Sequence, residues 1–205
     1  MQVKDKVFIL RKTRYGDADL ILNCLNPNGA RVSFIARSAV KSKKRFGGGV
    51  LEPTHYIHVL YDDKSGSSPL EQPLHTLKEA SIIDDFPNLR TSYERIEMAL
   101  HFVRLVSEVV REGEVDAADL FNLLGNALKA AEVSQNLEIL RVHFEAKILG
   151  NQGVLPIESD EEMFLKTPIS EHQKIVISES NLNLLKGRVR RVLRDYLQEY
   201  LKTTT

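Results

Sequence analysis

The chain has 205 residues, of which 42% are hydrophobic and 27% are charged. This ordinary composition excludes a collagen-like or largely disordered chain. No apolar run reaches the roughly 18 residues of a membrane-spanning helix, and the first residues lack the apolar stretch of a signal peptide. The single cysteine, Cys24, excludes an internal disulfide and a zinc site built from several thiolates. We therefore expect a soluble protein of a reducing compartment, with no membrane segment and no metal.

The formal net charge is zero, but the charged residues are unevenly distributed. Residues 1–60 carry a net charge of +7, residues 61–185 carry −11 and residues 186–205 carry +4. No acidic residue stands between Asp19 and Glu52, although several lysines and arginines do. Because a surface of one sign attracts polyanions, this stretch is a candidate contact for nucleic acid.

Short apolar runs bounded by turn residues predict five strands in the first 80 residues. Asn26–Gly29 is typical of a hairpin turn between the second and third strands. The segment 38–49 is too polar for a strand and ends in three glycines. Five short strands favour a small closed or nearly closed barrel. The predicted strands are Val7–Leu10, Leu20–Leu25, Arg31–Arg37, Tyr56–Tyr61 and Leu74–Ala80.

From Leu89 onward the apolar spacing becomes helical, and four helices are predicted. The first should turn an apolar face inward, and the second should begin after Asp116 as N-cap. The third runs from about Leu137 to Ile148, and the last spans about Asn181–Lys202. The inward face expected for the first helix comprises Leu89, Tyr93, Ile96, Leu100, Val103 and Val110.

Residues 154–178 are predicted to be irregular, with at most a short strand at 174–178. Their acids, Glu158 and Asp160–Glu162, are expected to be solvated. The expected fold class is α+β: a β-barrel domain at 1–80, followed without a flexible linker by a helical domain at 81–205.

Catalytic signatures are missing from the sequence. The six histidines are scattered, no glycine motif suits a phosphate, and Cys24 lies within a strand pattern where core packing is expected. We therefore predict a protein that is not an enzyme and that holds no metal or other cofactor.

The segment Arg37–Arg45 places five cations among nine residues, with serines and glycines beside them. Cations neutralise phosphates, and hydroxyl and backbone N–H groups donate hydrogen bonds to them. A merely solvated loop is the alternative. Phe34, Phe46 and Tyr56 could stack on bases or pack in the core, and the cations of the last helix could form a second phosphate strip or a solvated face. The candidate nucleic-acid-binding residues are Arg14, Arg31, Arg37, Lys41, Lys43, Lys44, Arg45, Arg190, Arg191 and Arg194.

Four groups of short motifs follow one another along the chain. They are Tyr15-Gly16-Asp17-Ala18-Asp19; Ala36-Arg37 through Lys43-Lys44-Arg45-Phe46 to Leu51-Glu52-Pro53; Leu89-Arg90-Thr91-Ser92-Tyr93 with Leu120-Phe121-Asn122-Leu123-Leu124; and Phe144-Glu145 with Gly153 and Pro156. In order and spacing they resemble the RecO family of bacterial recombination mediators over nearly the whole chain.

This resemblance implies an N-terminal OB-fold and a C-terminal helical domain. It also implies binding of single- and double-stranded DNA without sequence preference, annealing of complementary strands, and a cytoplasmic location near the nucleoid. The implied partners are RecR and the single-stranded-DNA-binding protein, with RecA loaded indirectly. Many members carry a four-cysteine zinc site after the Phe-Glu helix, whereas residues 154–178 occupy that place here without cysteine.

Two alternatives remain open at the level of sequence. One is an OB-fold RNA-binding protein, and the other is a protein–protein adaptor whose basic patch docks acidic tails. Arg141, a cation in an otherwise apolar helix, is a candidate for docking a partner's terminal carboxylate, the alternative being an ordinary surface arginine.

Overall fold

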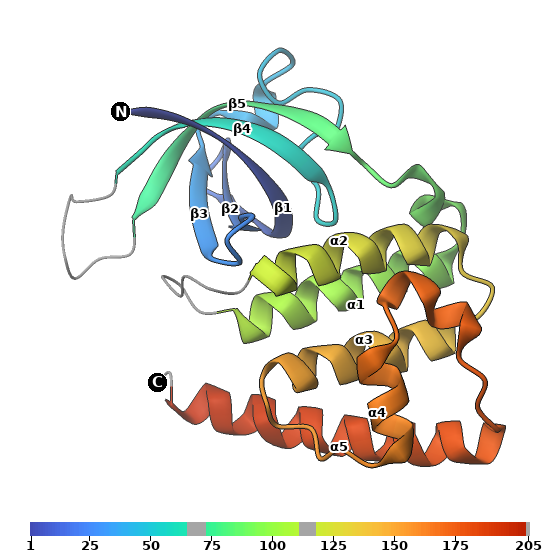
Figure 1. Cartoon of the computed structure of the whole chain (residues 1–205). Coiled ribbons are helices and arrows are strands. Elements are labelled where there is room, and N and C mark those ends of the chain that lie inside the picture. The colour runs from blue at the N-terminus through green and yellow to red at the C-terminus, as the bar shows by residue number, and fades with distance from the viewer. Residues whose placement is uncertain (65–72, 111–117, 204–205) are drawn as a thin grey trace. The chain divides into compact units, whose positions relative to one another are not determined.

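The computed structural model describes residues 1–64, 73–110 and 118–203 (Figure 1). Five strands close into a barrel in the order β1-β2-β3-β5-β4, and β4 pairs back onto β1. β3 and β5 run parallel, whereas the other pairs are antiparallel. This arrangement confirms the predicted barrel and the α+β class. The strands are β1 (Gln2–Tyr15), β2 (Asp19–Leu25), β3 (Arg31–Ala36), β4 (Tyr56–Asp62) and β5 (Leu74–Asp84).

β1 is much longer than its apolar run predicts. Its first half, Gln2–Phe8, pairs with β4, and its second half, Phe8–Tyr15, pairs with β2. Both halves therefore have their backbone groups satisfied although most of their side chains are polar. An apolar run marks only the part of this strand that crosses the barrel core.

Side chains from all five strands fill the barrel. Val7, Leu22, Phe34 and Ile57 are fully buried, and Cys24 lies among them. Burial raises the pKa of the Cys24 thiol, so the group stays neutral. The prediction that Cys24 is a core residue is confirmed.

The hairpin turn between β2 and β3 also agrees with the sequence. The Asn26 side-chain oxygen accepts hydrogen bonds from the backbone N–H groups of Asn28 and Ala30, at 3.1 and 3.0 Å. Gly29 has a φ of 79°, which favours glycine. This turn sets the register of the two strands.

All four predicted helices form, and the short elements η2, α4 and η3 accompany them. The apolar residues Leu120, Leu124, Ala127, Leu128 and Ala131 of α2 are buried, whereas the N-cap predicted for this helix, Asp116, lies outside the described residues. None of the helices in the described part of the chain is long and apolar enough to cross a membrane. The elements are η2 (Pro87–Thr91), α1 (Tyr93–Val109), α2 (Ala118–Val133), α3 (Leu137–Asn151), α4 (Ser159–Lys166), η3 (Ile169–Lys174) and α5 (Glu179–Thr203).

The contacts group the chain into two compact units: Met1–Phe86 with Val103–Asn122, and Pro87–Phe102 with Leu123–Thr205. In the first unit the Phe8 ring lies 4.6 Å from Tyr56 and 4.9 Å from Phe121 of α2. In the second unit α3 is largely buried, and Phe144 stacks on Phe102 at 4.1 Å. The division into domains at residue 80 stays a prediction.

The predicted inward face of α1 is wrong at two positions. Tyr93 is 78% exposed and Leu100 is 44% exposed, whereas Phe102 and Leu105 are buried. Apolar residues occupy more than one side of this helix, so their spacing alone does not select the buried side.

The prediction for residues 154–178 is also wrong, because the segment contains α4 and η3 and no strand forms at 174–178. Glu161, expected in a solvated run, is 1% exposed. Its Oε1 accepts a hydrogen bond from Arg188 Nε at 2.7 Å. The partner comes from α5, so no local pattern could have shown that this acid is buried.

Two buried histidines brace this segment. His143 on α3 lies with Nε2 at 3.0 Å from the carbonyl oxygen of Thr167, so Nε2 carries the proton and donates. His172 in the same way donates from Nδ1 to the Ile169 carbonyl at 3.1 Å, while Nε2 lies 2.8 Å from Ser134 Oγ. In both hydrogen bonds to carbonyl oxygens, a buried imidazole donates one N–H, which a neutral ring can do.

Burial lowers the pKa of His143 to about 4, from an ordinary value near 6.5. The folded protein therefore resists protonation that the unfolded chain accepts, so stability is full above pH ~6.5 and falls as the pH drops toward ~4. We expect the titration of His143 alone to lower the free energy of unfolding by about 2 kcal/mol between pH 7 and pH 4.5, as measured by urea unfolding. His143→Gln, which does not titrate, should flatten this dependence; an equally steep loss in the variant would contradict the assignment.

Candidate nucleic-acid interface

The basic loop, residues 37–49, follows β3 and is anchored by apolar side chains at both ends. Ala39, in the short helix η1 (Ala39–Lys41), and Phe46 are buried with the barrel core. The Val40 N–H donates to the carbonyl of Ala18 at 3.0 Å, which ties the loop to the β1–β2 turn. The anchored ends hold the intervening cations at the surface.

Asp19 holds the start of the loop. Its Oδ1 accepts a hydrogen bond from the Ser38 backbone N–H at 2.7 Å, and its Oδ2 lies 3.7 Å from Arg37 Nη1. Ser38 has a φ of 55°, a left-handed conformation that is uncommon for a residue with a Cβ. The carboxylate therefore stabilises a strained turn, which gives Asp19, the last residue of the Tyr15–Asp19 motif, a structural role.

Beyond the loop, Glu52 of the Leu-Glu-Pro motif is also paired. Its carboxylate accepts from Lys12 Nζ of β1 at 2.6 Å, and the adjacent Leu51 is buried. The two acids that border the acid-free stretch are thus both paired within the protein, Asp19 with the loop and Glu52 with β1.

The loop's own cations remain largely available. Lys41, Lys43 and Lys44 are exposed, and none of their ammonium groups has a hydrogen bond or ion pair to another described residue. Arg45 donates from Nη2 to the Arg37 carbonyl at 3.0 Å, and its guanidinium lies 5.1 Å from the centre of the Phe46 ring. The loop thus presents three ammonium groups that have no partner among the described residues.

The structure brings Arg14 to this end of the barrel but not Arg31. Arg14 pairs with Leu20, and Leu20 pairs with Ala36, so Arg14 lies two strands from the loop, about 10 Å away. Arg31 begins β3, about 16 Å along the strand from Ala36, and it is half-buried with an interaction of its own.

The predicted aromatic candidates do not offer free faces. Phe34 and Phe46 are buried in the barrel, and Tyr56 stacks on Phe8, so core packing is confirmed for the first two. Tyr15, which sequence reasoning did not select, is 57% exposed beside Arg14 at the end of β1. The sequence could have indicated Tyr15, because an aromatic residue directly before the turn glycine Gly16 lies at the exposed end of a strand.

The basic residues of α5 divide into two groups. Lys186 bonds to Glu138, and Arg188 lies 3.0 Å from Glu158 as well as bonding to Glu161. Arg190 and Arg191 are exposed and have no partner among the described residues, and Arg194 lies 3.4 Å from its neighbour Asp195. Of these five residues, Arg190 and Arg191 are free to meet a ligand, and Arg194 is bound only to its exposed neighbour.

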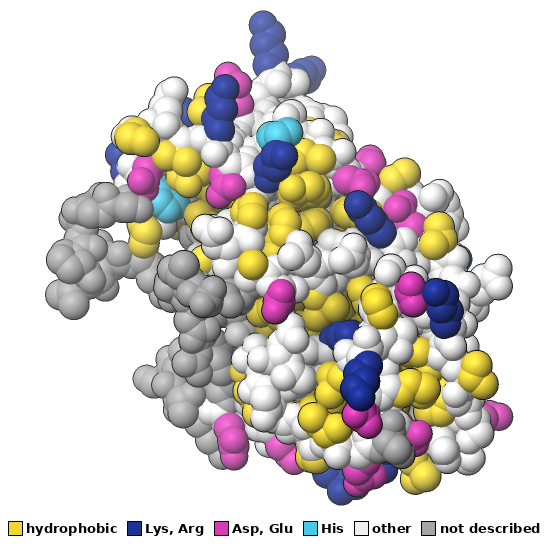
Figure 2. All heavy atoms as spheres, in the orientation of Figure 1, with side chains coloured by type: hydrophobic (Ala, Val, Ile, Leu, Met, Phe, Trp, Pro, Cys, Tyr) yellow, Lys and Arg dark blue, Asp and Glu magenta, His cyan; other side chains and the backbone are white. Residues whose placement is uncertain are grey.

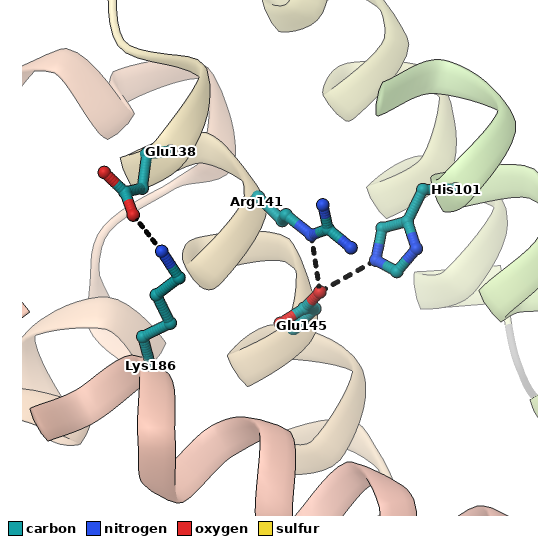
Figure 3. Close-up of polar contacts among 5 residues, drawn as sticks. All are labelled: His101, Glu138, Arg141, Glu145 and Lys186. Carbon is teal, nitrogen blue, oxygen red and sulfur yellow. Dashed lines mark hydrogen bonds and ion pairs between the residues drawn. The ribbon is translucent and has the colours of Figure 1, made fainter. Parts of the chain in front are cut away.

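Arg141 belongs to a buried polar cluster (Figure 3). Its Nε donates to Glu145 Oε1 at 3.1 Å, and the same oxygen lies 2.8 Å from His101 Nε2. Although burial opposes ionisation, hydrogen bonds from His101 and Arg141 lower the pKa of Glu145 below its usual value. The Arg141 side chain remains 29% exposed, and its Nη groups have no hydrogen bond to the described residues.

The described part of the chain contains no candidate metal site. Within residues 1–64, 73–110 and 118–203 there is no group of three or more His, Cys, Asp or Glu side chains placed to hold a metal ion.

Comparison with known proteins relates the chain to DNA repair proteins. The family model described as "Recombination protein O N terminal" matches residues 1–86. The DNA repair protein RecO of Syntrophus aciditrophicus is 32% identical over 175 residues, which cover 85% of this chain and 64% of that protein. The proteins of the same name from Alkaliphilus metalliredigens and Desulfosudis oleivorans are 29% and 31% identical over 76% and 72% of the chain. The chain spans 55–64% of the length of these three relatives.

The Asp19 anchor predicts how the loop responds to substitution. Asp19→Ala removes a charge-assisted hydrogen bond at Ser38, so we expect a loss of about 1–2 kcal/mol in the free energy of unfolding. Limited trypsin digestion should cleave the Asp19→Ala variant faster than the wild type after the lysines of the loop. Asp17→Ala is the matched control, because that exposed acid engages Arg14 only through its carbonyl. Equal cleavage rates in both variants would show that Asp19 does not hold the loop.

Proposed function

Because the chain belongs to the RecO family, we propose that it acts in DNA repair and recombination by binding DNA through the basic loop. In this proposal it binds single- and double-stranded DNA without sequence preference, anneals complementary strands, and has no catalytic activity. It works in the bacterial cytoplasm near the nucleoid. The observation that carries the proposal is the exposed, unpaired set Lys41, Lys43 and Lys44 on an anchored loop.

The chemistry of the loop suits a sugar–phosphate backbone. Each ammonium group can neutralise one phosphate and release its counterions. Contacts to phosphates position the strand but carry no sequence information, which fits binding without sequence preference. Arg37 and Arg45 add guanidinium groups at the base of the loop, where Arg14 also lies.

Tyr15 adds an exposed aromatic ring, which the cationic side chains of the loop do not provide. An exposed aromatic ring beside a cationic loop can stack on an unpaired base, and such stacking tolerates any sequence. We assign Tyr15 this role on single-stranded DNA. Arg190, Arg191 and Arg194 on α5 are a second proposed phosphate contact, and Arg31 contributes least because of its place on β3.

A second arm of the proposal concerns partners. RecR and the single-stranded-DNA-binding protein are the proposed direct partners, and RecA loading on gapped DNA is the proposed result. The Nη groups of Arg141 could form a bidentate pair with a partner's terminal carboxylate while Nε stays on Glu145. Support comes from the partial exposure of this guanidinium.

An annealing assay with short complementary oligonucleotides tests the function. A faster rate of duplex formation with the protein than without it supports the proposal. Tight RNA binding without annealing would favour an OB-fold RNA-binding protein. Binding of acidic peptides alone would favour an adaptor, and either result would overturn the proposal.

The triple variant Lys43→Ala/Lys44→Ala/Arg45→Ala tests the loop. Up to three phosphate contacts are lost, so the slope of log affinity against log salt should become shallower by about 2. Fluorescence anisotropy on labelled oligonucleotides of several sequences should show an equal loss on all of them. Stability should change by less than about 0.5 kcal/mol, because these side chains are exposed.

The matched control removes three exposed lysines from the helices, as Lys129→Ala/Lys166→Ala/Lys174→Ala. It has the same change in net charge as the loop variant. If the loop makes the phosphate contacts, this control should leave the slope of log affinity against log salt unchanged. A loop variant that behaves like this control would exclude the loop, and the DNA surface would then be sought at Arg190, Arg191 and Arg194.

Arg141 is tested with a synthetic peptide that copies the C-terminus of the single-stranded-DNA-binding protein of the same organism. The wild type should bind the free-acid peptide better than the amidated one. Arg141→Ala should abolish this preference, and Arg141→Lys should restore it only partly, because an ammonium does not pair in bidentate fashion. An unchanged preference in Arg141→Ala would exclude Arg141 as the carboxylate site.

A further inference from the structure

A groove on the outer face of the barrel lies outside the basic loop. It has a volume of about 390 Å³ and crosses β1, β4 and β5. The strand register arranges the outward side chains of this face in two neighbouring rows: Lys4, Leu60 and Glu79 in one, and His58 and Ser81 in the other, where Lys6 lies beside the groove. Figure 2 shows Lys, Arg and His side chains among hydrophobic ones on the barrel. The residues that line the groove are Lys4, His58, Val59, Leu60, Glu79, Ala80 and Ser81.

The ammonium groups of this face have no partner among the described residues. Lys4 and Lys6 are exposed, and neither ammonium group has a hydrogen bond or ion pair to a described residue. The nearby carboxylate of Asp62 is already paired with Lys78 at 2.8 Å. Two ammonium groups therefore face the single carboxylate of Glu79, and the face attracts an anion.

The spacing of the lysines suits a polymer of phosphates. Lys4 and Lys6 are alternate residues of one strand, so their Cα atoms lie about 6.7 Å apart on the same face. Two nucleotides of a stacked strand rise by about the same distance. His58, directly opposite Lys6, and Ser81 beside it can donate further hydrogen bonds to phosphate oxygens.

The remaining lining distinguishes nucleic acid from an acidic peptide. Leu60, half-buried between Lys4 and Glu79, offers an apolar floor on which a base can lie. Glu79 can accept a hydrogen bond from a base amino group, as acidic side chains do with cytosine.

We propose that this groove binds a short stretch of single-stranded DNA, with Lys4 and Lys6 on its phosphates and Leu60 under a base. This inference rests on the proposed function and extends it. The barrel would then hold nucleic acid on two separate surfaces, the basic loop and this groove. Two surfaces on one barrel give each of two strands a place before they anneal.

The test compares Lys4→Ala/Lys6→Ala with the control Lys129→Ala/Lys174→Ala, which has the same change in charge. Salt titrations on a labelled single strand should give a slope shallower by about 1.4 for the groove variant only, at about 0.7 for each lost contact. From 50 to 200 mM salt, the wild type's advantage in affinity over this variant should shrink about sevenfold. Unfolding midpoints in urea should match the wild type, since both lysines are exposed.

The outcomes separate this inference from the proposed function. If the wild type binds single-stranded DNA and the groove variant matches the control, the groove is excluded while the proposed function stands. If the wild type binds no DNA, both fail. A polyglutamate peptide should compete equally weakly with DNA on the wild type and the groove variant. Stronger competition on the wild type would identify an acidic-peptide site and overturn the inference.

Discussion

The pairing of β1 with two strands at once is the constraint on which the rest of the barrel depends. Its first half closes the barrel against β4, and its second half carries β2. One continuous strand therefore places Lys4 and Lys6 on the outer face and delivers Tyr15 and Arg14 to the end where the basic loop begins. Because hydrogen bonds along the whole strand fix this register, the proposed DNA contacts lie on a rigid support.

Ion pairing within the protein separates structural charges from available ones. On α5, Lys186 and Arg188 are engaged by acids from other segments, which attach the helix to α3 and to α4. Removing Arg188 would leave the buried carboxylate of Glu161 without its partner, and such losses cost several kcal/mol. The exposed lysines of the loop have no such role. They can therefore bind a ligand without weakening the fold.

The segment 154–178 is stabilised by polar contacts and apolar packing in the absence of cysteine. His143 and His172 bond to backbone carbonyls of the segment, Arg188 holds Glu161, and Phe164 is fully buried. These contacts operate with neutral imidazoles, which ties the stability of this region to pH.

By itself, the sequence determined the barrel, the helices, the core position of Cys24 and the cationic loop, because strand alternation, helical spacing and charge runs are local properties. Only the tertiary structure decided which cations are free, since Lys186 and Arg188 meet acids 48 and 27 residues away. It also decided that Tyr15 and Tyr93 are exposed and that Glu161 is buried. The groove at Lys4, His58 and Glu79 exists only through strand register, because three distant segments must pair before their side chains share one face.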